Sequence, residues 1–196
     1  MAIPQPIKRY TAEEYLELER ASEVKHEFYQ GEIFAMSGAS LPHNRIQMNF
    51  TGGTHAFLKG KGCDVFGSDL RVHIPSNGLF TYPDAVIACG QPELLNDGGL
   101  DNLLNPVAII EVLSKSTQSY DRGDKFALYR AIPSLQEYIL IASESVAIEQ
   151  YTKQEDDTWI LKEVRQLNEQ LYIKTIHFSL PLTELYSGVS FEPPVT

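Results

Sequence analysis

The stretch Val107–Thr117, VAIIEVLSKST, has the composition of an apolar core strand but places Glu111 in the middle of it. A carboxylate loses its hydration on burial, so this position is costly unless a partner compensates for the charge. Alternation along a strand puts Glu111 on the same face as Ile109 and Leu113. Either a cation lies beside Glu111, or the segment is not a buried strand.

Upstream, LFTYPDAVIAC (79–89) predicts a second strand, in which Asp84 shares one face with Tyr82 and Val86. If the two strands are neighbours, the carboxylates of Asp84 and Glu111 lie close enough to share one divalent metal ion, since such ions take carboxylate oxygens as ligands. Two alternatives stay open. The Pro–Asp pair is also ordinary turn chemistry, and a buried acid often pairs with an arginine.

Downstream, SYDRGDKFALYRAI (119–132) predicts a helix that ends at Pro133 and carries Lys125. A lysine ammonium can polarise a water molecule or a phosphate oxygen. Helical side chains lean toward the N-terminus, so Lys125 should lean over Asp121 and back toward the strand that holds Glu111. The alternative is a surface ion pair between Asp121 and Lys125 with little energetic weight.

The remaining pattern predicts an α/β (α+β) fold, a mixed central β-sheet flanked by helices, with an N-terminal helix and hairpin. The helix should begin after Thr11, and the hairpin should turn at Gln30-Gly31. Further helices are predicted at 42–60 and 183–188, a loop at 90–105, and strands at 63–75, 135–143, 146–152 and 159–165.

Length and composition favour one soluble domain spanning 1–196 and a cytoplasmic location. No apolar run reaches membrane length, and the N-terminus does not have the pattern of a signal peptide. Cys63 and Cys89 are too few for a disulfide framework. The net charge of -10 argues against a broad basic face for nucleic acid, although a local cationic site remains compatible with it.

Three segments taken together, TYPDAVIA (81–88), VAIIEVLSKST (107–117) and YDRGDKFALYRAIPSLQEYILI (120–141), resemble the Uma-two family of restriction-endonuclease-like proteins. That family belongs to the PD-(D/E)xK nuclease superfamily. The resemblance covers about residues 10–150 and implies a restriction-endonuclease-like core there, followed by C-terminal strands and a tail at 151–196. It also implies DNA as the substrate, Mg²⁺ (or Mn²⁺) as the cofactor and a homodimer.

The resemblance further implies which residues form the site. Asp84 and Glu111 would bind the metal together with the backbone carbonyl of Val112. The superfamily lysine would fall at Leu113, so Lys125 takes that catalytic role, with Lys115 as the rival. It also implies supporting roles for Glu27 and Glu32, with a solvent-facing strand position as the alternative, and for His43, with a helix cap as the alternative. Asp121 joins them through its helical spacing to Lys125.

Two hypotheses follow from the sequence. The first is a Mg²⁺-dependent endodeoxyribonuclease in which Lys125→Ala abolishes cleavage but leaves the fold and the metal affinity nearly intact. The second is a catalytically silent nuclease-like binding or regulatory module, which the acidic composition favours.

Overall fold

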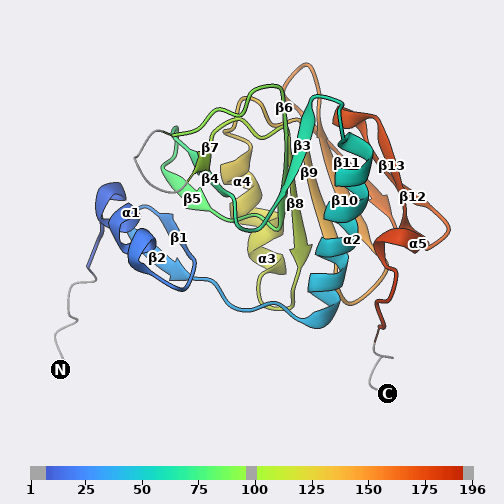
Figure 1. Cartoon of the computed structure of the whole chain (residues 1–196), viewed down its shortest axis with the longest axis horizontal. Coiled ribbons are helices and arrows are strands. Elements are labelled where there is room, and N and C mark those ends of the chain that lie inside the picture. Colours follow the sequence, from blue (N-terminus) through green and yellow to red (C-terminus); the bar gives the residue numbers. More distant parts are fainter. Residues whose placement is uncertain (1–7, 96–100, 192–196) are drawn as a thin grey trace.

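A six-stranded mixed sheet forms the centre of the molecule in the computed structural model, which describes residues 8–95 and 101–191 (Figure 1). Of its strand pairs only that of β8 (Ala108–Leu113) with β9 (Glu137–Ala142) is parallel. These two strands are connected by the helical segments α3 (Gln118–Tyr120), η1 (Asp121–Lys125) and α4 (Phe126–Tyr129). In spatial order the strands are β11 (Trp159–Val164), β10 (Ile148–Lys153), β9 (Glu137–Ala142), β8 (Ala108–Leu113), β6 (Ala85–Cys89) and β3 (Cys63–Gly67).

Strand β8 is buried on both faces, because helices cover both sides of the sheet. Its residues Ala108, Ile110 and Val112 belong to the core cluster that also contains Ile46 and Phe50 of α2 (Leu41–Leu58). The alternate residues face the segments α3 (Gln118–Tyr120), η1 (Asp121–Lys125) and α4 (Phe126–Tyr129). Glu111 therefore lies on the face that carries Lys125, as alternation predicts.

A second sheet holds the N-terminal part of the chain. Its order is β2 (Glu32–Ala35), β1 (His26–Tyr29), β5 (Leu79–Thr81), β4 (Arg71–Ile74) and β7 (Asn102–Leu103). The predicted hairpin is confirmed: Gln30 and Gly31 both have positive φ, +49° and +83°, as a two-residue type I′ turn requires. The predicted helix start is confirmed as well, since Thr11 caps α1 (Ala12–Ala21) with both hydrogen bonds of a capping box.

The C-terminal part of the chain packs on the main core. The predicted turn of helix is α5 (Leu182–Leu185), but the sequence reasoning missed the two-stranded ribbon of β12 (Gln170–Ile173) and β13 (Phe178–Pro181) with η2 (Lys174–Ile176) between the strands. Leu171 and Leu180 are buried in the α2 core cluster. The ribbon and α5 are thus part of the main core.

Three local expectations need correction. The predicted strand 79–89 is two strands, β5 and β6, and Asp84 lies in the break before β6 because Pro83 has no N–H to continue a ladder. The predicted helix 119–132 contains the π-helical turn η1. Cys63 and Cys89 are joined as a disulfide, because they are register partners in the β3–β6 pair, which their sequence spacing does not reveal.

Two further points concern the limits of the chain. Parts of the predicted loop 90–105, of the N-terminus and of the C-terminal tail, namely residues 96–100, 1–7 and 192–196, lie outside the described residues. Within 8–95 and 101–191, no helix combines the length and the apolar composition needed to cross a bilayer.

Candidate active site

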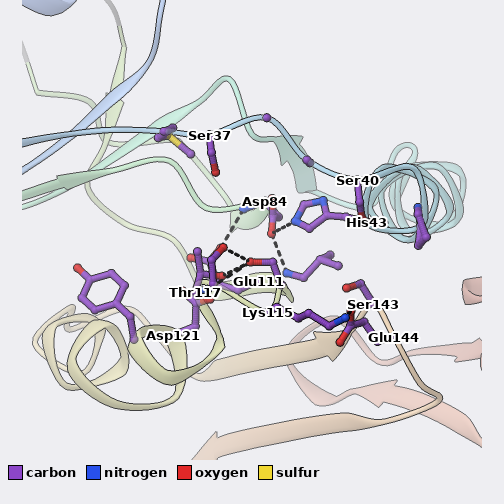
Figure 2. A pocket seen from close by; sticks show the side chains of 18 of the residues that line it. Ser37, Ser40, His43, Asp84, Glu111, Lys115, Thr117, Asp121, Ser143 and Glu144 are labelled. Carbon is purple, nitrogen blue, oxygen red and sulfur yellow. Dashed lines mark hydrogen bonds and ion pairs between the residues drawn. The ribbon is translucent and has the colours of Figure 1, made fainter. Parts of the chain in front are cut away.

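The antiparallel register of β6 and β8 brings Asp84 and Glu111 together. Ala85 pairs with Ile110, so Asp84 lies opposite Glu111, one step beyond the last paired residues. The Asp84 N–H donates to Glu111 Oε2 at 3.3 Å, and the Val112 N–H donates to Asp84 Oδ2 at 2.7 Å. Figure 2 shows Asp84 and Glu111 linked in this way inside one pocket. The proximity predicted from the sequence is present.

Glu111 is almost completely buried, at 4% exposure. Its Oε1 accepts hydrogen bonds from Lys125 Nζ at 2.9 Å and from the Tyr129 hydroxyl at 2.8 Å. Burial raises the pKa of Glu111 to about 8, because the loss of hydration outweighs the attraction of Lys125. The ammonium of Lys125 thus lies beside Glu111, and the divalent metal predicted at the same carboxylate stays a prediction.

Lys125 lies at the end of η1, and its ammonium contacts three carboxylates. The distances from Nζ are 2.9 Å to Glu111, 3.0 Å to Glu27 and 3.8 Å to Asp121. Burial by itself lowers the pKa of Lys125, but the surrounding negative charges raise it well above its ordinary value. The Asp121 contact that the helical spacing predicts is therefore the longest of the three. Lys125 also lies in a π-helical turn, η1, and such turns are rare and occur often at functional sites.

His43 contacts the other carboxylate. It belongs to the first turn of α2, where its N–H is capped by the Ser40 side chain, and its side chain is 11% exposed. Its Nε2 lies 3.1 Å from Asp84 Oδ2 (Figure 2). The alternative role for His43, capping the helix, is wrong, because Ser40 is the N-cap of α2. The imidazole of His43 faces Asp84 instead.

Two residues named from the sequence lie apart from this cluster. Glu32 pairs with Arg9 at 3.1 Å, with 41% of its side chain exposed, and it is not among the residues that line the pocket. Lys115 lines the pocket but is 79% exposed and pairs with Glu144 at 3.0 Å (Figure 2). The structure therefore brings Lys125, and not Lys115, into contact with Glu111.

Two other members of the cluster, Glu27 and Tyr129, make contacts that were not predicted from the sequence. Glu27 was considered as a metal ligand, but its carboxylate accepts from Lys125 and from the Thr81 hydroxyl. Tyr129 was missed, although it follows Lys125 by four positions, a spacing that puts two side chains on one helix face. This spacing of four residues from Lys125 was the feature of the sequence that could have identified Tyr129.

The cluster forms part of the lining of a cleft of about 1090 Å³. The linker between β2 and α2 (residues 36–40) lines the cleft together with the end of β8 and the residues that follow it. The cluster contains four carboxylates, those of Glu27, Asp84, Glu111 and Asp121, and the ammonium of Lys125, which contacts all of them except Asp84. With His43 neutral, this group has a formal charge of −3 when the acids are ionised, which favours the entry of a cation.

The donor set suits a hard divalent cation. Within the described ranges, no group of three or more His, Cys, Asp or Glu side chains is arranged to hold a metal ion. However, Mg²⁺ commonly binds one or two carboxylates and keeps several waters. Asp84 and Glu111 supply the two carboxylates. The Val112 N–H points at Asp84, and the carbonyl of a strand residue points to the same side as its N–H, so the Val112 oxygen also faces this edge. The residues therefore fit Mg²⁺ or Mn²⁺.

The chain is similar to known proteins at the level of family, of sequence and of structure. The model of the Uma2 family, whose description is "Putative restriction endonuclease", matches residues 12–183. Two Synechocystis proteins, slr1290 and sll1609, are 34% and 35% identical over 186 and 171 residues; these matches cover 95% and 87% of this chain and 96% of each relative. A crystal structure titled as a "putative nuclease belonging to DUF820" from Anabaena variabilis superimposes with a TM-score of 0.74 at 18% identity, and the match covers 93% of this chain and 98% of that one. This structural likeness shows a shared fold.

Proposed function

Because the chain belongs to the Uma2 family, we propose that it hydrolyses phosphodiester bonds in DNA, with Mg²⁺ or Mn²⁺ held by Asp84, Glu111 and the Val112 carbonyl. One observation carries the proposal: Asp84, Glu111 and Lys125 form one hydrogen-bonded chain on the lining of a single cleft. These are the residue types that metal-assisted hydrolysis of a phosphodiester requires.

The bound ion would polarise the phosphoryl group and lower the pKa of water near it. Lys125 would donate hydrogen bonds to a phosphate oxygen or to the attacking water. An ammonium among three carboxylates keeps its proton, so it acts as a donor and not as the base. Water adds to phosphorus, one P–O ester bond breaks, and the departing oxygen ends as a hydroxyl.

The other residues of the cluster would keep the reacting groups in place. His43 fixes Asp84, and Tyr129 fixes Glu111, because each donates to or faces one carboxylate oxygen at hydrogen-bond distance. Glu27 and Asp121 balance the charge of Lys125. Preorganised donors and charges of this kind lower the barrier because they need no rearrangement when the reaction occurs.

A specific observation also keeps the silent-module hypothesis in competition. Both Glu111 oxygens already accept hydrogen bonds within the protein, as they would in a purely structural network. The two functions make opposite predictions about turnover. A binding module would retain DNA binding and show no hydrolysis with any divalent ion.

The test is hydrolysis of supercoiled plasmid DNA and of bis(p-nitrophenyl) phosphate with Mg²⁺, Mn²⁺ or EDTA. We expect turnover with the ions and none with EDTA. Asp84→Asn should reduce turnover by about 10²-fold or more, since it removes a metal-binding charge. Lys115→Met is the matched control for a residue that lines the same cleft and should change turnover less than about threefold. Binding of DNA without turnover under every condition would contradict the enzyme proposal.

A further inference from the structure

One long segment of this acidic chain contains no acidic residue. Residues 33–63, between Glu32 and Asp64, have no Asp or Glu, although 26 of the 196 residues are acidic and about four would be expected in 31 positions. The same segment contains three basic residues, Arg45, Lys59 and Lys61. With histidines neutral its formal charge is +3, and the rest of the chain therefore carries −13.

This segment leads away from the candidate active site. Its first part, the linker 36–40 with Pro42 and His43, lines the cleft. The chain then continues as α2, which lies along the outside of the central sheet (Figure 1). The segment ends in the turn that carries Lys59 and Lys61 before β3. The start of α2 thus lies at the cleft, and Lys59 and Lys61 lie beyond its other end.

The solvent-facing positions of α2 make up one continuous surface. These positions recur at helical spacing, and with Lys61 they are here named the α2 face: Leu41, Asn44, Arg45, Met48, Gly52, His55, Ala56, Lys59 and Lys61. Leu41 and Met48 are 65% and 69% exposed, which is unusual for large apolar side chains. A Cβ at Gly52 would meet no atom within 4 Å, so a partner can approach the helix closely there.

The charge on the α2 face identifies the kind of partner. A strand of nucleic acid carries one phosphate per about 3.4 Å and is repelled by acidic surfaces. The elements β3 and α5, which pack against α2, carry one acid each, Asp64 and Glu184. Arg45 is held by the Gly188 carbonyl, so the long cations available for phosphates are Lys59 and Lys61. Lys61 lies over the ring of Phe57 and Lys59 is exposed.

We propose that a DNA strand lies along the α2 face while its scissile phosphodiester occupies the cleft, with Lys59 and Lys61 binding phosphates at the distant end. This inference rests on the proposed function, since it assigns the substrate path to the same site. The 18 residues of α2 span about 27 Å at 1.5 Å per residue. At 3.4 Å per phosphate, Lys59 and Lys61 would act about eight nucleotides from the cleft.

This distance makes substrate length the test. Binding of fluorescein-labelled duplexes of 20 and 5 base pairs is measured by anisotropy with Mg²⁺, on an Asp84→Asn background that limits cleavage. Lys59→Gln with Lys61→Gln should weaken binding of the 20-base-pair duplex by about tenfold and lower the slope of log affinity against log salt by about two. Binding of the 5-base-pair duplex should change by less than about twofold, because it does not reach these lysines.

Arg130→Gln with Lys162→Gln is the matched control, since both residues are exposed and lie off the α2 face, on α4's C-cap and on the edge strand β11. If the control pair lowers affinity and salt slope as much as the α2 pair, the inference is wrong. It is also wrong if both duplexes lose affinity equally, or if the parent does not bind the 20-base-pair duplex.

A second readout separates this inference from the proposed function. Hydrolysis of bis(p-nitrophenyl) phosphate, which fits the cleft without reaching α2, should be unchanged in Lys59→Gln with Lys61→Gln. If the parent does not hydrolyse that small diester, the result contradicts the enzyme proposal but not the proposed DNA path along the α2 face. The length-dependent loss of DNA affinity would then still support the α2 face as a binding surface.

Discussion

Replacing Lys125 by methionine tests the charge balance of the cluster. The ammonium is 7% exposed and lies within 4.0 Å of three carboxylates, those of Glu27, Glu111 and Asp121. Methionine has a similar length but no charge, so the variant leaves these acids buried without their cation. Breaking a buried ion pair by removing one partner costs about 3–5 kcal/mol. For a domain of this size, each kcal/mol lowers the melting temperature by about 2–4 °C, so a decrease of roughly 6–20 °C is expected in EDTA.

The same reasoning predicts that a divalent ion restores stability. Mg²⁺ or Mn²⁺ would supply the positive charge that the variant lacks, so the added ion should raise its melting temperature more than that of the parent. Calorimetry or differential scanning fluorimetry in EDTA, and then over a titration of Mn²⁺, measures both effects. The sequence reasoning expected Lys125→Ala to leave the fold nearly intact, and the burial of Lys125 is the reason for expecting otherwise.

Two controls make the measurement decisive. Lys115→Met removes an exposed ion pair with Glu144 and should cost less than about 1 kcal/mol. Adding Glu27→Gln to Lys125→Met removes one of the unpaired charges, so the double variant should be more stable than Lys125→Met alone. A Lys125→Met variant that melts within about 1 °C of the parent in EDTA would refute the reasoning.

Two further predictions concern His43 and His73, and a third concerns the oligomeric state. His43→Ala should weaken Mn²⁺ binding about 10–100-fold in calorimetric titrations by releasing Asp84, and His43→Gln should restore part of it; equal affinity in all three proteins would contradict the positioning role. Burial lowers the pKa of His73 below its ordinary value of 6.5, so its contribution to stability is present above pH 6.5 and decreases as the pH falls through the lowered pKa. His73→Phe should therefore flatten the dependence of the urea midpoint on pH below 6.5, and an unchanged slope would count against this. The symmetric homodimer expected from the family resemblance predicts that light scattering at micromolar concentration gives about twice 22.0 kDa, and a purely monomeric species would end that expectation.

Local interactions explain what could be predicted from the sequence. The capping box at Thr11, the turn at Gln30-Gly31 and the buried strand around Glu111 each depend on residues close to one another in the chain. The set of Asp84, Glu111 and Lys125 was predicted because each lies on or beside one of three elements, β6, β8 and η1, whose sequences have a readable pattern. Their proximity then required only that β6 and β8 be neighbours.

Contacts between distant segments were decided by the tertiary structure alone. Glu27 reaches Lys125 because β1 pairs with β5 in the second sheet, and Glu32, five residues later, faces Arg9 at the surface. Two other features depend in the same way on packing and on strand register: the direction of His43 toward Asp84, and the pairing of Cys63 with Cys89.

Glu111 shows this division most clearly. The residue types around Glu111 already require that a carboxylate on this buried strand has a positive partner, because desolvation of a charge is a local cost. Which cation lies there depended on the crossover from β8 to β9, which places Lys125 within 2.9 Å of Glu111. A pattern of residue types sets the energetic requirement of a site, whereas strand order and register decide which side chain meets it.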